Sequence, residues 1–284
     1  MSSQKRATTA GQVMEIRNQV VGLIRFSFAT IGSFYPGFDT IEDMEAFLFD
    51  ADRLKRRFRL FESYCLPSLA NQTDPDFCVI LLVGANMPGP WKTRLRELTA
   101  SIAAVRIVEA RPQHHYAGIK RTLNAHPSDG FTHRTTFRLD DDDAVDNDFV
   151  ARLKRLAPLA ARVGGAQHAT VIAHNLGFYL ELREDQTLVY PTCERTPLSV
   201  GAALIAPAPY LENIYKVDHR QLPQYFNTYC DTRHYSYVRT IHPDNKANPH
   251  RTGLKLEMPN AEIDAILRQN FGRKLGEFKH LPPL

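Results

Sequence analysis

Four consecutive carboxylates, Asp140 to Asp143, are the residues of this sequence best suited to chemistry. At about 4 Å, two like charges repel each other by on the order of 1 kcal/mol even in water, so such a cluster predicts a cationic partner. Carboxylate oxygens favour hard divalent ions, and Mg²⁺ is commonly held by one or two carboxylates together with substrate phosphates. If the chain is extended here, Asp140 and Asp142 point to the same side. The alternative is an acidic turn at a helix N-terminus, where carboxylates are favourable without any ligand.

The elements around this acidic quartet follow a strand–helix alternation. Predicted strands at residues 20–26, 77–83, 105–108 and 135–139 alternate with predicted helices at 52–69, 91–102 and 116–125. The run at 77–83 is continuously apolar, as in a parallel strand covered on both faces. We therefore predict an α/β fold with a mostly parallel, doubly wound sheet. Ligands of such sheets bind beyond the carboxyl ends of the strands, where the quartet lies.

The pattern changes at residue 165. Residues 170–182 and 188–190, separated by four polar residues, predict a β-hairpin, and 199–205 predict another buried strand. The expected organisation is a flexible N-terminal tail (1–19), an α/β half (20–164) and a smaller, mixed C-terminal region (165–284).

Composition excludes several classes of protein. The chain has 284 residues, 35 Lys+Arg against 31 Asp+Glu and 43% hydrophobic residues, as in globular proteins. The longest apolar run, residues 78–85, is far below the ~20 residues of a membrane-spanning helix. Residues 1–19 lack the apolar core of a signal peptide, so we expect a cytoplasmic chain. The four cysteines form no C-x-x-C pair, and we expect neither disulfides nor zinc. No run of five basic residues marks a nucleic-acid surface.

The sequence around the quartet resembles the D-x-D region of nucleotide-sugar-dependent glycosyltransferases with the GT-A fold. More specifically, it is similar to the bacterial rhamnosyl transferase family. The resemblance covers residues 20–250 in order. It rests on Phe137-Arg138-Leu139-Asp140-Asp141-Asp142-Asp143-Ala144-Val145 with Asp148-Phe149-Val150, on Arg25-Phe26, on Leu66-Pro67-Ser68-Leu69 with Gln72, on Asp76-Phe77, and on Val238-Arg239-Thr240-Ile241-His242 with Asn245.

The resemblance implies a metal site. In this interpretation Asp140 and Asp142 hold Mn²⁺ or Mg²⁺ on the diphosphate of the donor, where the ion neutralises charge on the leaving group. Asp141 and Asp143 serve in the alternative register, and Asp141 can otherwise contact the ribose hydroxyls. His242 resembles a third metal ligand, and an ordinary loop histidine is the alternative.

The resemblance also implies how the donor and the acceptor are bound. The half at 20–164 holds a nucleotide-diphosphate sugar, with Arg25 and Arg138 as nucleotide contacts, because arginine suits bidentate recognition. The region at 165–284 holds a glycan or lipid-linked acceptor and completes the metal site. The basic isoelectric point, about 8.8, is compatible with docking at an anionic membrane surface.

Transfer with inversion requires a general base close to the acceptor hydroxyl. Asp218 is our first candidate and His219 our second, although Asp218 can equally cap a helix. Glu194 is a third candidate that an ion pair with a neighbouring arginine explains as well. The donor sugar and the choice between inversion and retention stay open at this point.

Two other functions are compatible with an acidic quartet. A phosphohydrolase of the D-x-D-x-[TV] type uses the first aspartate as nucleophile, but the fifth position here is Ala144. A calcium-binding or carbohydrate-binding module is the non-enzymatic alternative. The EF-hand pattern is absent, because Val145 stands where that pattern requires glycine.

Overall fold

The structure, a computed structural model, describes residues 15–32, 37–243, 245 and 253–281. Its helices and strands are, in chain order, β1 (Asn18–Phe26), β2 (Thr30–Ile31), α1 (Ile41–Leu48), α2 (Ala51–Leu60), the π-helical turn η1 (Phe61–Cys65), α3 (Leu66–Ala70), β3 (Cys78–Gly84), α4 (Gly89–Thr99), β4 (Val105–Ala110), β5 (Gln113–His114), α5 (His115–Asn124), β6 (His133–Asp140), β7 (Ala144–Val145), α6 (Phe149–Gly164), β8 (Thr170–His174), β9 (Leu176–Leu182), β10 (Thr187–Cys193), β11 (Ala203–Pro207), the 3₁₀ turn η2 (His219–Gln221), α7 (Leu222–Tyr225), β12 (Asn227–Asp231), β13 (Tyr237–Ile241), β14 (Leu254–Lys255), α8 (Asn260–Phe271) and α9 (Leu275–Lys279).

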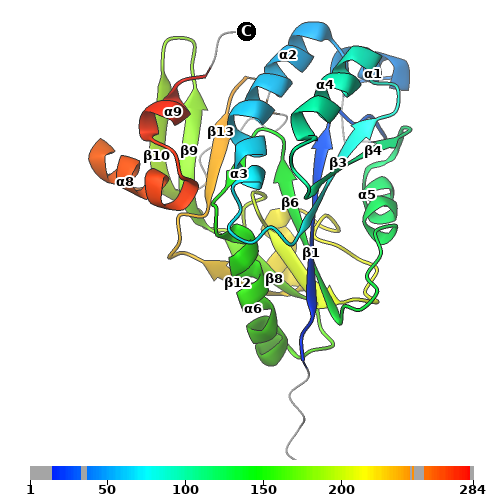
Figure 1. Ribbon diagram of the computed structural model, residues 1–284, viewed down its shortest axis with the longest axis vertical. Coiled ribbons are helices and arrows are strands. Elements are labelled where there is room, and N and C mark those ends of the chain that lie inside the picture. Colours follow the sequence, from blue (N-terminus) through cyan, green and yellow to red (C-terminus); the bar gives the residue numbers. More distant parts are fainter. Residues whose placement is uncertain (1–14, 33–36, 244, 246–252, 282–284) are drawn as a thin grey trace, which may run out of the picture.

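A seven-stranded sheet with the order β12-β8-β11-β6-β1-β3-β4 forms the centre of the molecule (Figure 1). β1 pairs in parallel with β3 and β6, β3 with β4, and β12 with β8, whereas β11 is antiparallel to both of its neighbours. Every residue of β3 is buried, as its continuous apolar run predicts. The predicted α/β class with a mostly parallel sheet is therefore confirmed.

The strand order reverses between β1 and β6. From β1 the chain winds outward to β3 and β4, and it then returns through α5 to β6 on the other side of β1. Such a switch point is where open α/β sheets bind their ligands. Arg25 and Asp140 are register partners at this end of the β1–β6 pair, so two predicted site residues face each other at the switch point.

Helices cover both faces of this sheet. One core combines sheet residues with Leu54 and Phe58 of α2, Leu95 of α4 and Leu153 of α6. The core on the other face contains Ile119 of α5 and residues that follow β11, including Ile214, Tyr215 and Leu222. The Tyr215 hydroxyl donates to the carbonyl of Leu23, which places the ring beneath β1. The doubly wound arrangement therefore holds α2 and residue 215 on opposite sides of the switch point.

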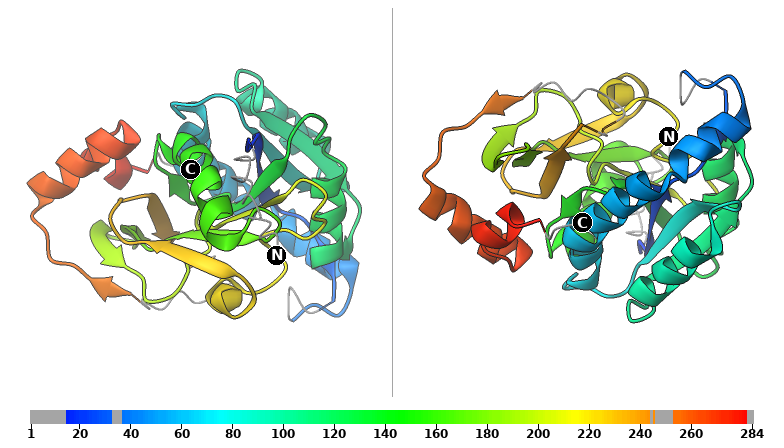
Figure 2. Two further views of the ribbon diagram at one scale, coloured as in Figure 1. Left: turned by 90° about the horizontal axis from the view of Figure 1, so that it is seen from below. Right: turned by 90° about the horizontal axis from the view of Figure 1, so that it is seen from above.

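A second sheet with the order β14-β10-β9-β13-β7 is mixed and mostly antiparallel. With α8 and α9 it lies beside the main sheet, at the opposite end of the molecule from β4 (Figures 1 and 2). The predicted hairpin is present as β9 and β10. β8, predicted as part of that hairpin, instead belongs to the main sheet, because the chain changes sheets at Asn175.

The two sheets do not follow the predicted division of the chain at residue 164, because each of them contains strands from both sides of it. β8, β11 and β12 complete the main sheet, and β7, directly after the quartet, pairs with β13 of the second sheet. The quartet therefore lies where the two sheets meet. Of the predicted tail, residues 1–14 lie outside the described residues, and Asn18 and Gln19 are already part of β1.

The predicted helix at 52–69 is continuous through α2, η1 and α3, despite Pro67. A proline removes the hydrogen bond to the carbonyl four residues earlier. That carbonyl belongs to Ser63, and it accepts a hydrogen bond from Arg273 instead, at 2.5 Å. Pro67 lies two residues after the π-helical turn η1, where the regular hydrogen-bond pattern of the helix is already interrupted.

All four cysteines are free: Cys65 and Cys78 are buried, Cys193 is half-buried and Cys230 is exposed. None of the helices in the described part of the chain has both the length and the hydropathy that crossing a bilayer requires.

Gly22 in β1 allows the ring of Phe137 in β6 to pack directly against the central strand. A Cβ atom built on Gly22 lies 2.2 Å from Phe137 Cζ. We expect Gly22→Ala to lower the free energy of unfolding by about 1–3 kcal/mol, because the buried ring has to move. Chemical denaturation measures this loss. Gly89→Ala, whose added Cβ meets nothing within 4 Å, is the control, and equal losses in both variants would contradict the explanation.

Candidate functional site

An ion pair joins the two central strands, β1 and β6, at the switch point. Arg25 donates from one guanidinium nitrogen to Asp140 Oδ1 at 2.9 Å and from the other to His115 Nε2 at 3.0 Å. Burial alone would raise the pKa of Asp140, but the guanidinium groups of Arg25 and Arg138 hold it below its ordinary value. Asp140 is therefore ionised, and its side chain is one-third exposed.

Two arginines lie over the ring of Tyr215. The guanidinium carbons of Arg138 and Arg25 are 4.8 and 5.7 Å from the ring centroid. The Tyr215 hydroxyl donates to the carbonyl of Leu23 at 2.7 Å, which fixes the ring beneath β1. Arg138 forms no ion pair with any carboxylate of the described residues. The stack therefore presents positive charge beside Asp140.

Arg57 of α2 binds two members of the quartet. Its Nε donates to Asp141 Oδ2 at 3.1 Å, one terminal nitrogen donates to Asp141 Oδ1, and the other donates to Asp142 Oδ2 at 3.0 Å. The three side chains are only 11%, 4% and 7% exposed. Arg57 is not among the residues that the sequence predicts for the site. The sequence feature that could have identified Arg57 is its position on α2 beside the apolar residues Leu54 and Phe58, on the buried face of the helix.

Asp142 also meets His242, which is 100 residues later in the chain. His242 Nε2 lies 2.9 Å from Asp142 Oδ2, and the Asn245 side-chain amide donates to the same oxygen at 3.2 Å. The Asn245 carbonyl in turn accepts from the backbone of His242 at 2.7 Å. Burial would raise the pKa of Asp142, but Arg57 and His242 hold it below its ordinary value. Asp142 is therefore an ionised carboxylate in contact with an imidazole.

Asp143 has a different role from its neighbours. Its Oδ1 accepts from the backbone of Thr240 at 2.9 Å, which extends the pairing of β7 with β13 toward His242. Burial, and then the charges of Asp142 and Asp140, raise the pKa of Asp143 well above its ordinary value. Asp143 therefore anchors the strand that carries His242. Of the four carboxylates, Asp140 has the most exposed side chain, and Asp142 is the one in contact with His242.

The predicted base candidates lie in two places. Asp218 caps η2, where its carboxylate accepts from the backbone of Arg220 at 2.9 Å, and its side chain is half-exposed. His219 is mostly buried, and burial followed by the charge of Arg138 lowers its pKa to about 4, so that it is neutral near pH 7. Glu194 directly follows β10 of the second sheet, and the Tyr179 hydroxyl donates to it. Of these candidates, His219 is the one on which the charge of Arg138 acts.

The side chains at the site supply only some of the ligands that a divalent ion needs. Residues 15–32, 37–243, 245 and 253–281 contain no group of three or more His, Cys, Asp or Glu side chains that could hold a metal ion. Asp142 and His242 are in contact, whereas Asp140, the third predicted ligand, is paired with Arg25. A carboxylate oxygen and an imidazole nitrogen suit Mn²⁺ or Mg²⁺ if phosphate oxygens and water supply the other positions. The residues therefore fit an ion that the substrate helps to bind.

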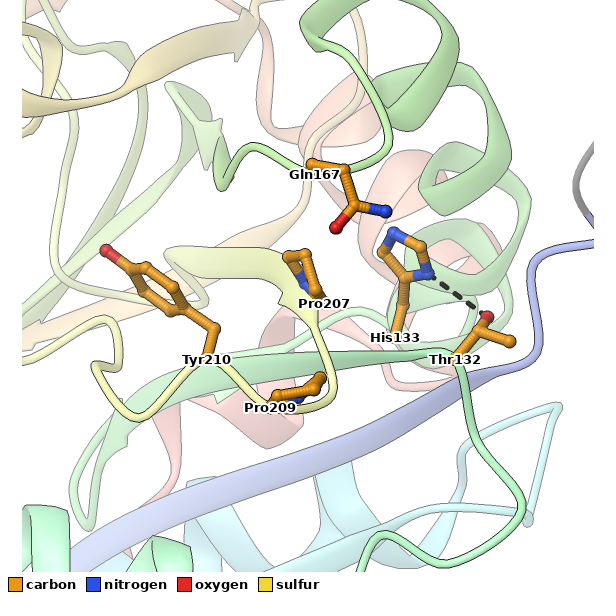
Figure 3. Close-up of a pocket in the computed structure, with 6 residues that line it drawn as sticks. All are labelled: Thr132, His133, Gln167, Pro207, Pro209 and Tyr210. Atoms are coloured by element: carbon orange, nitrogen blue, oxygen red, sulfur yellow. Dashed lines mark hydrogen bonds between the residues drawn. The ribbon is translucent and has the colours of Figure 1, made fainter.

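A cavity of about 430 Å³ lies at the opposite end of β6 (Figure 3). His133, the first residue of β6, lines it with Thr132, Gln167, Pro207, Pro209 and Tyr210. The His133 ring nitrogens already bond with the carbonyl of Ala166, at 2.9 Å, and with the Thr132 hydroxyl, at 3.1 Å. This cavity is therefore separate from the quartet, which begins at the last residue of the same strand.

Residues 19–254 match the model of a protein family described as "Putative rhamnosyl transferase". Among solved structures, the chain is similar to S. aureus TarS 1–349 in complex with UDP-GlcNAc, with 11% identity, a TM-score of 0.44, and coverage of 88% of this chain and 65% of that chain. It is also similar to HddC from Yersinia pseudotuberculosis, with 10% identity, a TM-score of 0.35, and coverage of 79% and 93%. The chain thus spans less than two thirds of the TarS chain. No curated protein matches the chain.

Proposed function

The chain belongs to the rhamnosyl transferase family, a family of glycosyltransferases, and from this we propose that it transfers a sugar from a nucleotide-diphosphate donor to a hydroxyl of a glycan or lipid-linked acceptor. The observation that carries this proposal is the meeting of two pairs, Arg25–Asp140 and Asp142–His242, at the switch point of the main sheet. The family description makes rhamnose the first sugar to test.

The four free thiols agree with a cytoplasmic location.

The arginine stack supports a diphosphate-binding role. Arg138 carries a charge that none of the described carboxylates pairs with, and Arg25 lies beside it over Tyr215. Guanidinium groups bind phosphate oxygens in bidentate fashion. Asp141 is less suited to the proposed ribose contact, because its buried carboxylate is engaged by Arg57 through both oxygens.

Asp142 and His242 are the proposed protein ligands of Mn²⁺ or Mg²⁺, and Asp140 is the nearby carboxylate with an exposed side chain. Such an ion, when bound, neutralises charge on the leaving diphosphate. Asp143 and Asn245 orient His242, the former through Thr240 and the latter through its own amide. The protein thus holds both ligands in place before the donor binds.

His219 is the proposed general base, with Asp218 beside it. A ring that is neutral near pH 7 can accept the proton of the acceptor hydroxyl, and His219 Nδ1 lies 3.9 Å from Asp218 Oδ2. Asp218 is half-exposed and occupied as a cap, so its carboxylate has the smaller proposed role.

We expect His219→Gln to lower the rate of nucleoside diphosphate release by about 10²–10⁴-fold, because general base catalysis contributes that much. Nucleotide affinity should stay unchanged, since glutamine keeps a polar side chain at this position. Asp218→Asn should lower the rate by less than about tenfold. The reverse order of the two effects would make Asp218 the base. Steady-state rates and calorimetric affinities, measured on the same preparations, separate these outcomes.

Calorimetric titration of UDP, GDP and dTDP into the purified protein tests the proposed function. With Mn²⁺ present, one nucleotide should bind, and EDTA should abolish that binding. If no nucleotide binds although Mn²⁺ does, the proposed function is wrong, and the phosphohydrolase and calcium-module alternatives gain weight.

A further inference from the structure

Arg57 gives the acidic quartet a permanent cation of its own. It comes from α2, 84 residues before Asp141, and it donates to three carboxylate oxygens of Asp141 and Asp142. An arginine side chain cannot be deprotonated in a protein, so this charge is present at every working pH. The proposed function uses Arg25 and Arg138 but assigns nothing to Arg57.

The charges at the site are nearly balanced in the free protein. Asp140 is paired with Arg25, and Asp141 and Asp142 share Arg57. Arg138, over the Tyr215 ring, is the third guanidinium, so three carboxylates face three cations. Asp143 and Arg239, whose charges interact, add one more carboxylate and one more guanidinium. A divalent ion that approaches Asp142 therefore meets little net negative charge, and the Arg57 guanidinium repels it at close range.

We propose that Arg57 is a positioning residue that keeps the affinity of the free protein for a divalent ion low, so that the ion binds Asp142 and His242 only together with a nucleotide diphosphate. This inference rests on the proposed function. The diphosphate brings the negative charge that the balanced site lacks. By linkage, the nucleotide raises the affinity for the ion by the same factor as the ion raises the affinity for the nucleotide.

A purely structural Arg57 would behave differently. Its replacement would then lower stability and leave the affinity for Mn²⁺ alone unchanged or weaker. In our account the replacement strengthens the binding of Mn²⁺ alone, because it removes a repelling charge next to an ionised ligand. The affinity for the bare ion therefore separates the two roles without any measurement of turnover.

Titration of Mn²⁺, followed by the electron paramagnetic resonance signal of the free ion, tests the proposal on the full chain. Wild-type protein should bind Mn²⁺ at least tenfold more tightly with its nucleotide than without it. Arg57→Met should bind Mn²⁺ alone at least tenfold more tightly than wild type does. Arg57→Lys, which keeps the charge, should stay within threefold of wild type. Arg59→Met is the matched control on the same helix, since Arg59 donates to the carbonyl of Leu281.

A second pair of variants covers the case in which Arg57→Met does not fold. Arg57→Met combined with Asp141→Asn removes one charge of each sign, and it should bind Mn²⁺ at least tenfold more tightly than Asp141→Asn alone. Equal affinities in this pair, or wild-type protein that binds Mn²⁺ equally well with and without nucleotide, would overturn the proposal. If no nucleotide binds while loss of Arg57 still strengthens Mn²⁺ binding, the proposed function fails and the effect of Arg57 on the ion is upheld.

Discussion

Asp142→Asn is expected to weaken Mn²⁺-dependent nucleotide binding by about a hundredfold or more. Replacing a residue that hydrogen-bonds to a metal ligand typically lowers metal affinity or activity by about 10–100-fold. Replacing a ligand itself should therefore cost at least as much as the upper end of that range. The amide oxygen can still accept from Arg57, which keeps the local structure, but it lacks the negative charge that the ion requires. Calorimetry with the preferred nucleotide, with Mn²⁺ and with EDTA, measures the loss.

Asp143→Asn is the matched control for this variant. Burial and the neighbouring carboxylates raise the pKa of Asp143, which favours its neutral form, and an asparagine oxygen can accept from Thr240 in the same way. Nucleotide binding should therefore stay within a few-fold of wild type. A large loss in Asp143→Asn, with a small one in Asp142→Asn, would contradict the assignment and favour the alternative register of Asp141 and Asp143.

The second large effect concerns stability in acid. His174 at the end of β8 is buried, and neither ring nitrogen has a hydrogen-bond partner among the described residues. Burial, and then the charge of Arg152, lower its pKa from 6.5 to about 3. Between these two values the unfolded chain binds a proton that the folded chain does not. The free energy of unfolding therefore falls with pH below 6.5, by about 3 kcal/mol between pH 7 and pH 4.

His174→Leu should remove this part of the acid sensitivity. Leucine has no group to protonate and leaves no ring nitrogen buried without a partner, so stability at pH 7 should be retained or increased. Urea denaturation at pH 4 and pH 7 gives the two free energies. His168→Leu, at an exposed position, should keep the wild-type dependence. An unchanged pH dependence in His174→Leu would show that His174 is not its cause.

Local patterns in the sequence were sufficient for most of the main sheet. The continuous run of β3 and the four-and-three spacing of α2 and α4 each encode an element and its buried side. The position of Asp140 at the end of β6 follows from the same reasoning. The prediction of where the site lies therefore needed only the alternation of elements and the rule that ligands bind at strand ends.

Contacts between distant segments were not predictable in this way. The pairing of Arg57 with Asp141 depends on how α2 crosses the sheet, and the raised pKa of Asp143 depends on its burial in the folded chain. β8 was assigned to the hairpin because its residues continue the same apolar pattern across Asn175. Which strands pair is decided by the whole fold, so local periodicity carries no information about it.

We expect this chain to consume a nucleotide sugar at the quartet. The most direct measurement is the release of nucleoside diphosphate from a panel of donors, with a rhamnosyl donor first, in the presence of Mn²⁺ and with water or added glycans as acceptors. We expect that one donor is consumed, and that EDTA or Asp142→Asn stops the reaction. Consumption that continues unchanged in Asp142→Asn, or no consumption of any donor by folded protein, would contradict it.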